Sequence, residues 1–393
     1  MQAYPAIMSL YVPGELHIEV VPGLDHVDAL QWDRLVEPNN PFMEHRFLYA
    51  LESSGSVGKS AGWAPCHIIV TRDGELVGAA PLYLKSHSYG EYIFDWGWAN
   101  AADRAGLDYY PKLVCAVPFT PASGRRLLLV DGFDNGPVLG ALIAGMREMA
   151  TRTQSSSIHV LFCTEDERAA LEAHDFMPRL TYQFHWTNSG PWGSFDEYLK
   201  SFRASARRKV NKERREATAS GLDIRLITGS SMSDAEVDAM YSFYVATATR
   251  KWGNPYLTHA FFRELNRSLD ERALVSMAYE NGRPVAGALG FQRGSHVYGR
   301  HWGCLDQYDK LHFELCYYQF IQACTERGWT RFEAGAQGEH KVKRGLLPSP
   351  TYSSHWISHP GLSRAVAEFL PQEAESNLAE MRYFDERSPF RRD

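Results

Sequence analysis

The sequence predicts an α+β fold made of two related halves, each a mixed, mostly antiparallel sheet flanked by helices. Segments 70–85 and 278–294 each contain an apolar strand, a tight turn and a second apolar strand. The turns are Asp73-Gly74 and Asn281-Gly282, which are strong hairpin signals. A third strand is expected after each pair, at 92–99 and 296–303. A similar motif that recurs 208 residues later indicates an internal duplication.

In the first half, a short helix is expected at 25–35 and a second at 39–55. Asn40 is placed as the cap of the second helix, Pro41 in its first turn and Gly55 at its exit. The break between the halves is expected near 186–195, which is rich in Gly, Ser, Asn and Pro. The predicted domains are therefore residues 13–190 and 191–393.

The second half opens with a basic helix at 194–220, with Ser194 as its N-cap. The apolar residues at 199, 202, 206, 210 and 217 share one narrow face, so the helix is expected to lie on a core. After the second meander, 312–328 predicts an amphipathic helix that ends at Gly328, followed by a strand at 329–334. A loop is expected over 333–356. The C-terminal region is expected to be helical on both sides of Pro371.

Composition limits the classes of function. The chain has 393 residues with 44% apolar content, enough for two domains, and a net charge of −6. That charge gives no global attraction to nucleic acid, so such binding would need a local patch. We expect no membrane span, no signal peptide and a cytoplasmic protein. The six Cys form no C-x-x-C pair, and we interpret them as reduced, buried thiols without a metal.

The basic helix is a candidate phosphate-binding surface. Its cations suit RNA, a nucleotide pyrophosphate or a lipid phosphate, and they are Arg203, Arg207, Arg208, Lys209, Lys212, Arg214 and Arg215. The alternative is a solvated helix with a few ion pairs between successive turns.

The loop 333–356 is a candidate site for chemistry. Cations on a glycine-containing loop at a strand end are placed to hold an anion, and those here are Lys341, Lys343 and Arg344. His340 can take a proton from an attacking amine, with Glu339 or Glu333 as orienting group or alternative base. Gln337 and Tyr352 are further candidate substrate contacts. The alternative is that His340 is structural; His355 and Trp356 are expected to pack, and no metal site is expected.

Several long segments resemble the FemAB-like group of the GNAT acyltransferase superfamily, which is associated with peptidoglycan biosynthesis or recognition. They include "NPFMEHRFLYALESSGSVG", "SARRKVNKERREA" and "GAQGEHKVKRGLLPSPTYSSHW". The resemblance implies two GNAT-like halves. Fem transferases move an amino acid from aminoacyl-tRNA to an amine of a peptidoglycan precursor, whereas ordinary GNAT enzymes hold acetyl-CoA on a [QR]-x-x-G-x-[GA] loop. The stretch 304–315 has no glycine, and its expected counterpart 99–113 has one, which argues against a CoA site.

The resemblance therefore implies amide formation, with aminoacyl-tRNA as donor, an amine-bearing acceptor and no tightly bound cofactor. Acetyl-CoA remains an alternative donor, and a non-catalytic protein that binds peptidoglycan or a nucleotide sugar is a third possibility. Arg300 and His301 are placed in the same cleft as His340. A matching pocket in the first half is expected from Asp95, Trp96, Trp98, Tyr110 and Lys112. Glu314 is expected to be a cap or an ion-pair partner, and the protein a monomer or homodimer.

Overall fold

The structure, a computed structural model, describes residues 8–12, 16–130, 136–190, 192–219, 221–335 and 338–391. It divides into two compact units. Unit 1 comprises Met1–Glu37, Phe42–Thr181 and Pro350–Leu378. Unit 2 comprises Pro38–Pro41, Tyr182–Ser349 and Ala379–Asp393. Each unit thus combines segments that are distant in sequence. In the part of the chain described, no helix is long and apolar enough to cross a membrane.

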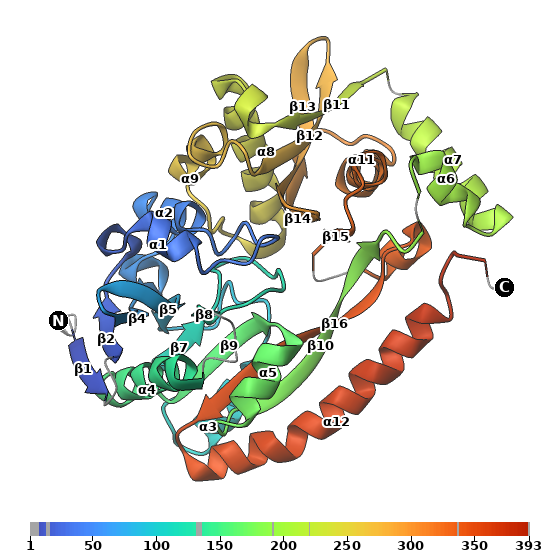
Figure 1. Cartoon of the computed structure of the whole chain (residues 1–393). Coiled ribbons are helices and arrows are strands. Elements are labelled where there is room, and N and C mark those ends of the chain that lie inside the picture. Colours follow the sequence, from blue (N-terminus) through green and yellow to red (C-terminus); the bar gives the residue numbers. More distant parts are fainter. Residues whose placement is uncertain are drawn as a thin grey trace. The chain divides into compact units, whose positions relative to one another are not determined.

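Unit 1 contains two sheets with strand orders β1-β2-β4-β5-β8 and β3-β6-β7-β9-β16 (Figure 1). The strands are β1 (Met8–Val12), β2 (Leu16–Val21), β3 (Trp63–Pro65), β4 (His67–Arg72), β5 (Glu75–Ala80), β6 (Leu82–Lys85), β7 (Lys112–Cys115), β8 (Leu128–Leu129), β9 (Ser157–Cys163) and the later part of β16 (Leu347–Ile357). The helices are α1 (Ala29–Asp33), α2 (His45–Ser53), α3 (Trp96–Arg104), α4 (Gly136–Arg152), α5 (Glu165–Glu172) and the first part of α12 (Pro360–Asp385).

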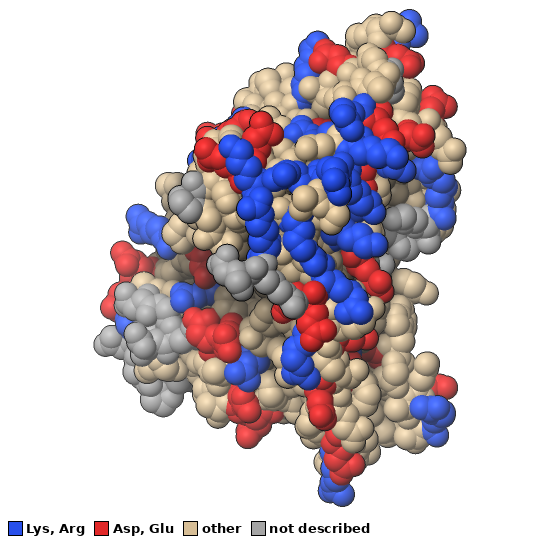
Figure 2. Space-filling model, turned by 90° about the vertical axis from the view of Figure 1, so that its right-hand side faces the viewer, with Lys and Arg blue, Asp and Glu red and all other residues tan. Residues whose placement is uncertain are grey.

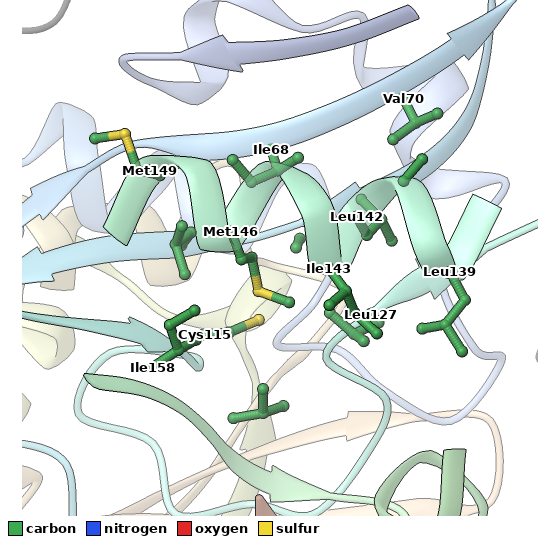
Figure 3. Close-up of a cluster of buried hydrophobic side chains, with 14 of the residues drawn as sticks. Ile68, Val70, Cys115, Leu127, Leu139, Leu142, Ile143, Met146, Met149 and Ile158 are labelled. Atoms are coloured by element: carbon green, nitrogen blue, oxygen red, sulfur yellow. The ribbon is translucent and has the colours of Figure 1, made fainter. Parts of the chain in front are cut away.

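The core of unit 1 forms around α4 (Figure 3). Leu142 and Met146 of this helix are fully buried, as are Ile68 of β4, Cys115 of β7 and Ile158 of β9. The apolar face of one helix therefore joins strands of both sheets, which is the burial that stabilises this layer.

Unit 2 contains one sheet in the order β11-β12-β13-β14-β15-β10. Its strands are β11 (Asp223–Thr228), β12 (Ala273–Glu280), β13 (Arg283–Arg293), β14 (His296–Cys304), β15 (Arg331–Glu333) and the end of β10 (Met177–Thr187). Its helices are α6 (Phe195–Lys200), α7 (Ala204–Thr218), α8 (Asp234–Trp252), α9 (His259–Arg263), α10 (Leu311–Phe313), the π-helical segment η6 (Glu314–Tyr318), α11 (Gln319–Arg327), the 3₁₀ helix η7 (Glu339–Arg344) and the end of α12.

Helices cover both faces of the unit 2 sheet. Gly287 of β13 faces Met240 and Phe243 of α8, whereas Gly290 of the same strand lies against Phe320 of α11. Figure 1 shows α8 and α11 on opposite sides of these strands. The two faces therefore have separate surroundings, which decides which candidate residues can share a site.

The predicted duplication is confirmed at the level of topology. Both predicted hairpins form, and all four turn residues have positive φ, which is the geometry that favours Asp-Gly and Asn-Gly. In unit 1, β7 and β9 are parallel and α4 connects them. In unit 2, β14 and β15 are parallel and are connected by α10, η6 and α11.

The last strand of each repeat pairs with the other repeat. β10 follows β9 and α5 along the chain, but it pairs antiparallel with β15. β16 follows β15 and η7, but it pairs antiparallel with β9. Each sheet is therefore completed by a strand that comes from the other half of the sequence.

Several local predictions are wrong. Residues 92–99 do not form a strand: α3 begins at Trp96 after Asp95, and the strand that enters the parallel pair is β7. The segment that corresponds to 304–315 is therefore 116–135 rather than 99–113, and residues 131–135 lie outside the described ranges. The N-cap of α2 is Glu44 and not Asn40.

Two further predictions change in detail. Ser194 caps a helix as expected, because its side chain accepts from the Glu197 backbone N–H, but the basic helix is broken into α6 and α7. The predicted loop 333–356 contains η7 and then most of β16. The strand β16 forms although it contains two prolines, and its polar residues Ser353, Ser354 and His355 are buried.

Candidate functional site

A groove in unit 2 joins the two regions that the sequence singled out. It has a volume of about 810 Å³ and lies between α7, η7 and the end of α12. Its lining comprises Arg203, Ser205, Ala206, Lys209, Glu339, His340, Val342, Lys343, Tyr383, Phe384, Glu386, Arg387 and Pro389. Four Lys or Arg residues face two Glu residues there, so the groove favours an anionic ligand.

The surface of α7 extends this positive charge. Arg203, Arg208, Lys209, Lys212 and Arg215 are exposed, and Arg207 is half-buried. Figure 2 shows Lys and Arg side chains gathered on the side of the molecule where α7 lies in Figure 1. Val210 and Ala217 are buried on the opposite face of the helix, as predicted.

Arg214 differs from the other cations of α7. Its guanidinium donates to both carboxylate oxygens of Glu314 and, at 2.9 Å, to Gln322. The prediction of Glu314 as an ion-pair partner is confirmed. Arg214 therefore attaches α7 to η6 and α11 rather than presenting its charge to a ligand.

His340 is exposed and lines the groove. Its Nε2 lies 3.0 Å from the hydroxyl of Tyr317, which belongs to η6. Burial raises the pKa of the Tyr317 phenol, so this hydroxyl stays protonated and can either donate to Nε2 or accept from it. Both protonation states of the imidazole therefore keep this hydrogen bond, which suits a group that gains and loses a proton.

The three cations of η7 have different environments. Lys343 is exposed and lines the groove. Lys341 is 3% exposed, and its Nζ donates to the Gly335 carbonyl oxygen at 2.8 Å. Arg344 is 4% exposed, and its Nη2 donates to Glu213 of α7 at 2.8 Å. The last two therefore hold the segment in place. The predicted contact Gln337 lies outside the described residues.

The structure separates the other candidate catalytic groups from His340. Glu333 is buried on β15, where it pairs with Arg331 at 2.9 Å and faces His185. His301 packs its ring against Tyr244 of α8, whereas His340 packs against η6, on the other face of the sheet. Glu339 is exposed and does line the groove. Arg300 is half-buried on β14, next to the β-bulge.

His185 predicts an acid sensitivity of unit 2. It is buried and its Nδ1 is 2.9 Å from Arg331 Nη2, which requires a neutral ring that accepts. Burial, and next the Arg331 charge, hold its pKa well below 6.5. Below pH 6.5 this histidine binds a proton in the unfolded chain but not in the native protein. The free energy of unfolding therefore decreases as the pH falls below 6.5.

Replacing His185 by Gln, which keeps an acceptor for Arg331, should make the free energy of unfolding fall less steeply with acid. The expected difference is about 1.4 kcal/mol per pH unit between about pH 6 and 5. Urea unfolding at several pH values measures it, and the exposed His26 replaced by Gln provides the control. Equal slopes for His185→Gln and the original chain would contradict this assignment.

The candidate pocket residues of the first half surround a buried lysine. Lys112 Nζ donates to Ser88 Oγ and Glu91 Oε2, each at 2.8 Å, and also to Asp95. Burial raises the pKa of Glu91 to about 7. Tyr110 is half-buried and its hydroxyl lies 2.8 Å from Ser88 Oγ. The structure thus brings Asp95, Tyr110 and Lys112 together, in an arrangement in which Lys112 pairs with two buried carboxylates.

The remaining candidates of unit 1 lie elsewhere. Trp98 is buried and its ring centroid is 4.8 Å from that of His355, which packs as predicted. Trp96 is 38% exposed and meets Tyr89 edge to face. Tyr352 lies on β16 and faces the Arg168 guanidinium at 5.6 Å. The sequence missed Tyr383 and Arg387 of the groove, because no local pattern connects the C-terminal residues to η7.

Comparison with the solved structure of FemX supports the fold. FemX superposes with a TM-score of 0.54 at 16% sequence identity, over 87% of this chain and 99% of FemX. The structure of L-PGS from Bacillus licheniformis gives a TM-score of 0.47 at 14% identity, over 82% and 95% of the two chains. A tandem GNAT protein from the clavulanic acid biosynthesis pathway gives 0.46 at 12% identity, over 88% and 99%. No curated protein matches this chain in sequence.

The duplicated topology defines a protein with two related α+β halves and a basic groove in the second. The chain belongs to the FemAB-like family, described as peptidoglycan biosynthesis/recognition, whose model matches residues 23–392.

Proposed function

We propose that this protein is an N-acyltransferase that moves an aminoacyl group from aminoacyl-tRNA to an amine acceptor in peptidoglycan precursor synthesis. The observation that carries the proposal is the groove itself, in which Arg203, Lys209 of α7 and Lys343 share one surface with His340. Cations that suit the phosphates of an RNA end, next to a candidate proton acceptor, support a donor of this kind.

The connection between β14 and α10 also supports a donor other than CoA. It consists of residues 305–310 and contains no glycine. A close backbone cradle for a pyrophosphate needs glycines, because side chains hold the ligand away from the N–H groups. Residues 99–113 contain most of α3 and are therefore not the counterpart of this connection.

The reaction follows from these groups. The acceptor amine attacks the ester carbonyl carbon of the aminoacyl-RNA, and a C–N bond forms while the ester C–O bond breaks. His340 takes the proton that the amine loses and returns it to the ribose hydroxyl that leaves. Lys343 lines the same groove as His340 and stabilises negative charge that develops on the carbonyl oxygen.

The test uses mixed tRNA charged with radiolabelled amino acids and a soluble peptidoglycan precursor with a free amine on its peptide. Label should move to the precursor, and ribonuclease treatment of the donor beforehand should abolish the transfer. A parallel reaction contains labelled acetyl-CoA. Transfer from acetyl-CoA that survives ribonuclease, with none from charged tRNA, would replace this proposal with an acyl-CoA-dependent enzyme.

A further inference from the structure

The end of α12 places an exposed aromatic ring in the groove. Tyr383 is 50% exposed, and the guanidinium carbon of Arg387 lies 3.4 Å from its ring centroid. Arg387 Nη1 also donates to the Tyr383 carbonyl oxygen at 3.0 Å. The ring and the guanidinium are therefore held together before any ligand binds.

Buried neighbours fix the position of this pair. Phe384 follows Tyr383 and is 8% exposed, with its ring centroid 5.4 Å from that of Phe184 and 6.2 Å from that of Tyr182. Tyr182 in turn donates its hydroxyl to Glu380 at 2.7 Å. The last turns of α12 are thus anchored to β10, and Tyr383 is exposed although the helix that carries it is packed.

The chemistry of the groove limits what this pair can bind. Exposed tyrosine rings and guanidinium planes stack on nucleobases, whereas phosphates need only the cations, which Arg203, Lys209 and Lys343 already provide. Bases inside a duplex are not available for such stacking. A stacking pair within a cationic groove therefore suits an unpaired stretch of nucleic acid.

We propose that Tyr383 and Arg387 form a platform on which an unpaired base at the acylated end of the RNA donor stacks. The inference rests on the proposed function and adds to it the part of the donor that the groove recognises. The platform holds the single-stranded end, the cations of α7 hold its phosphates, and the ester reaches His340 in the same groove.

The probe is an RNA hairpin with a four-nucleotide single-stranded 3′ end that contains 2-aminopurine, whose fluorescence falls when the base stacks. Binding to the full chain should quench this fluorescence. Tyr383→Ala should weaken binding by about 5- to 150-fold, the range for one base on one aromatic ring. Tyr383→Phe keeps the ring and should bind within about twofold of the original chain. Tyr89→Ala, at a tyrosine that is 57% exposed in unit 1, is the matched control.

Salt dependence separates stacking from charge. Lys209→Ala removes one phosphate contact and should lower the slope of log K against log salt by about 0.7. Tyr383→Ala should leave that slope unchanged, since no charge is lost. Arg387→Lys keeps the positive charge but removes the planar guanidinium. It should reduce the quenching of 2-aminopurine fluorescence and leave the slope of log K against log salt nearly unchanged.

The outcomes distinguish the two proposals. If the original chain binds the RNA and transfers the aminoacyl group, but Tyr383→Ala binds and quenches equally well, the platform is wrong and the proposed function stands. If the original chain binds no RNA at low salt, both are wrong. Unchanged circular dichroism of Tyr383→Ala would show that any loss is local, and Tyr383→Phe decides the question if the alanine variant is unstable.

Discussion

Replacing His340 by Ala should lower the rate of acyl transfer by about 10²–10⁴-fold, the usual contribution of a positioned general base. The loss should fall on kcat, with the KM for the RNA donor little changed, because the proposed phosphate contacts are Arg203, Lys209 and Lys343 and not the imidazole. The free energy of unfolding should change by less than about 1 kcal/mol, since the side chain is exposed. Steady-state kinetics and urea unfolding measure the two effects.

The pH dependence of the acyl-transfer rate tests more specifically whether His340 is the general base. A base that must be neutral gives a rate that rises with pH through its pKa, and that rise should disappear in His340→Ala. His26→Ala, at an exposed histidine of unit 1, is the matched control and should behave as the original chain. A His340→Ala enzyme within about threefold of the original kcat would exclude His340 as the base, and Glu339, which lines the same groove, would be tested next.

Replacing Glu213 by Gln should destabilise the protein by about 3–5 kcal/mol, the cost of leaving a buried charge without its partner. Glu213 is 6% exposed and accepts from Arg344 at 2.8 Å and from the Tyr318 hydroxyl. The Arg344 guanidinium also donates to the His340 carbonyl oxygen at 2.7 Å. The ion pair therefore fixes η7 against α7, and acyl transfer should decline together with stability.

Two variants make this prediction decisive. Glu216→Gln removes a half-buried partner of the exposed Lys212 on the same helix and should cost at most about 1 kcal/mol. The double variant Glu213→Met with Arg344→Met replaces the pair by apolar groups and should recover most of the stability, because no uncompensated charge remains. Urea unfolding gives the free energies, and a Glu213→Gln variant no less stable than Glu216→Gln would show that the pair does not anchor η7.

The elements that the sequence predicted well are those whose conformation is determined by residues within the same segment. The two hairpins follow from turn residues that accept positive φ, and the helix that ends at Gly328 follows from its apolar period and a left-handed cap. The π-helical segment inside that helix has no such signal, because it depends on how Tyr317 and Tyr318 pack. Residues 92–99 are expected to form a strand because they follow the first hairpin as 296–303 follow the second, but Asp95 precedes α3 and its carboxylate accepts from the buried Lys112.

In the candidate site, too, contacts between residues that are distant in the sequence could not be predicted. Lys341, Lys343 and Arg344 are equivalent cations in the sequence, and only the fold separates the two that are buried from the one in the groove. Burial depends on partners such as Glu213, which is more than a hundred residues away in the chain. Tyr383 and Arg387 join the groove through the path of α12, which no local pattern predicts.

The pairing of β16 with β9 has a consequence for biosynthesis. Unit 1 includes residues 350–378, so its sheet lacks a strand until the ribosome has translated β16. The first repeat must therefore leave the exit tunnel with one side of β9 unpaired and wait for its partner strand. A ribosome stalled before residue 350 should hold a nascent chain that proteases cut readily in the first repeat, and release of the full chain should protect it.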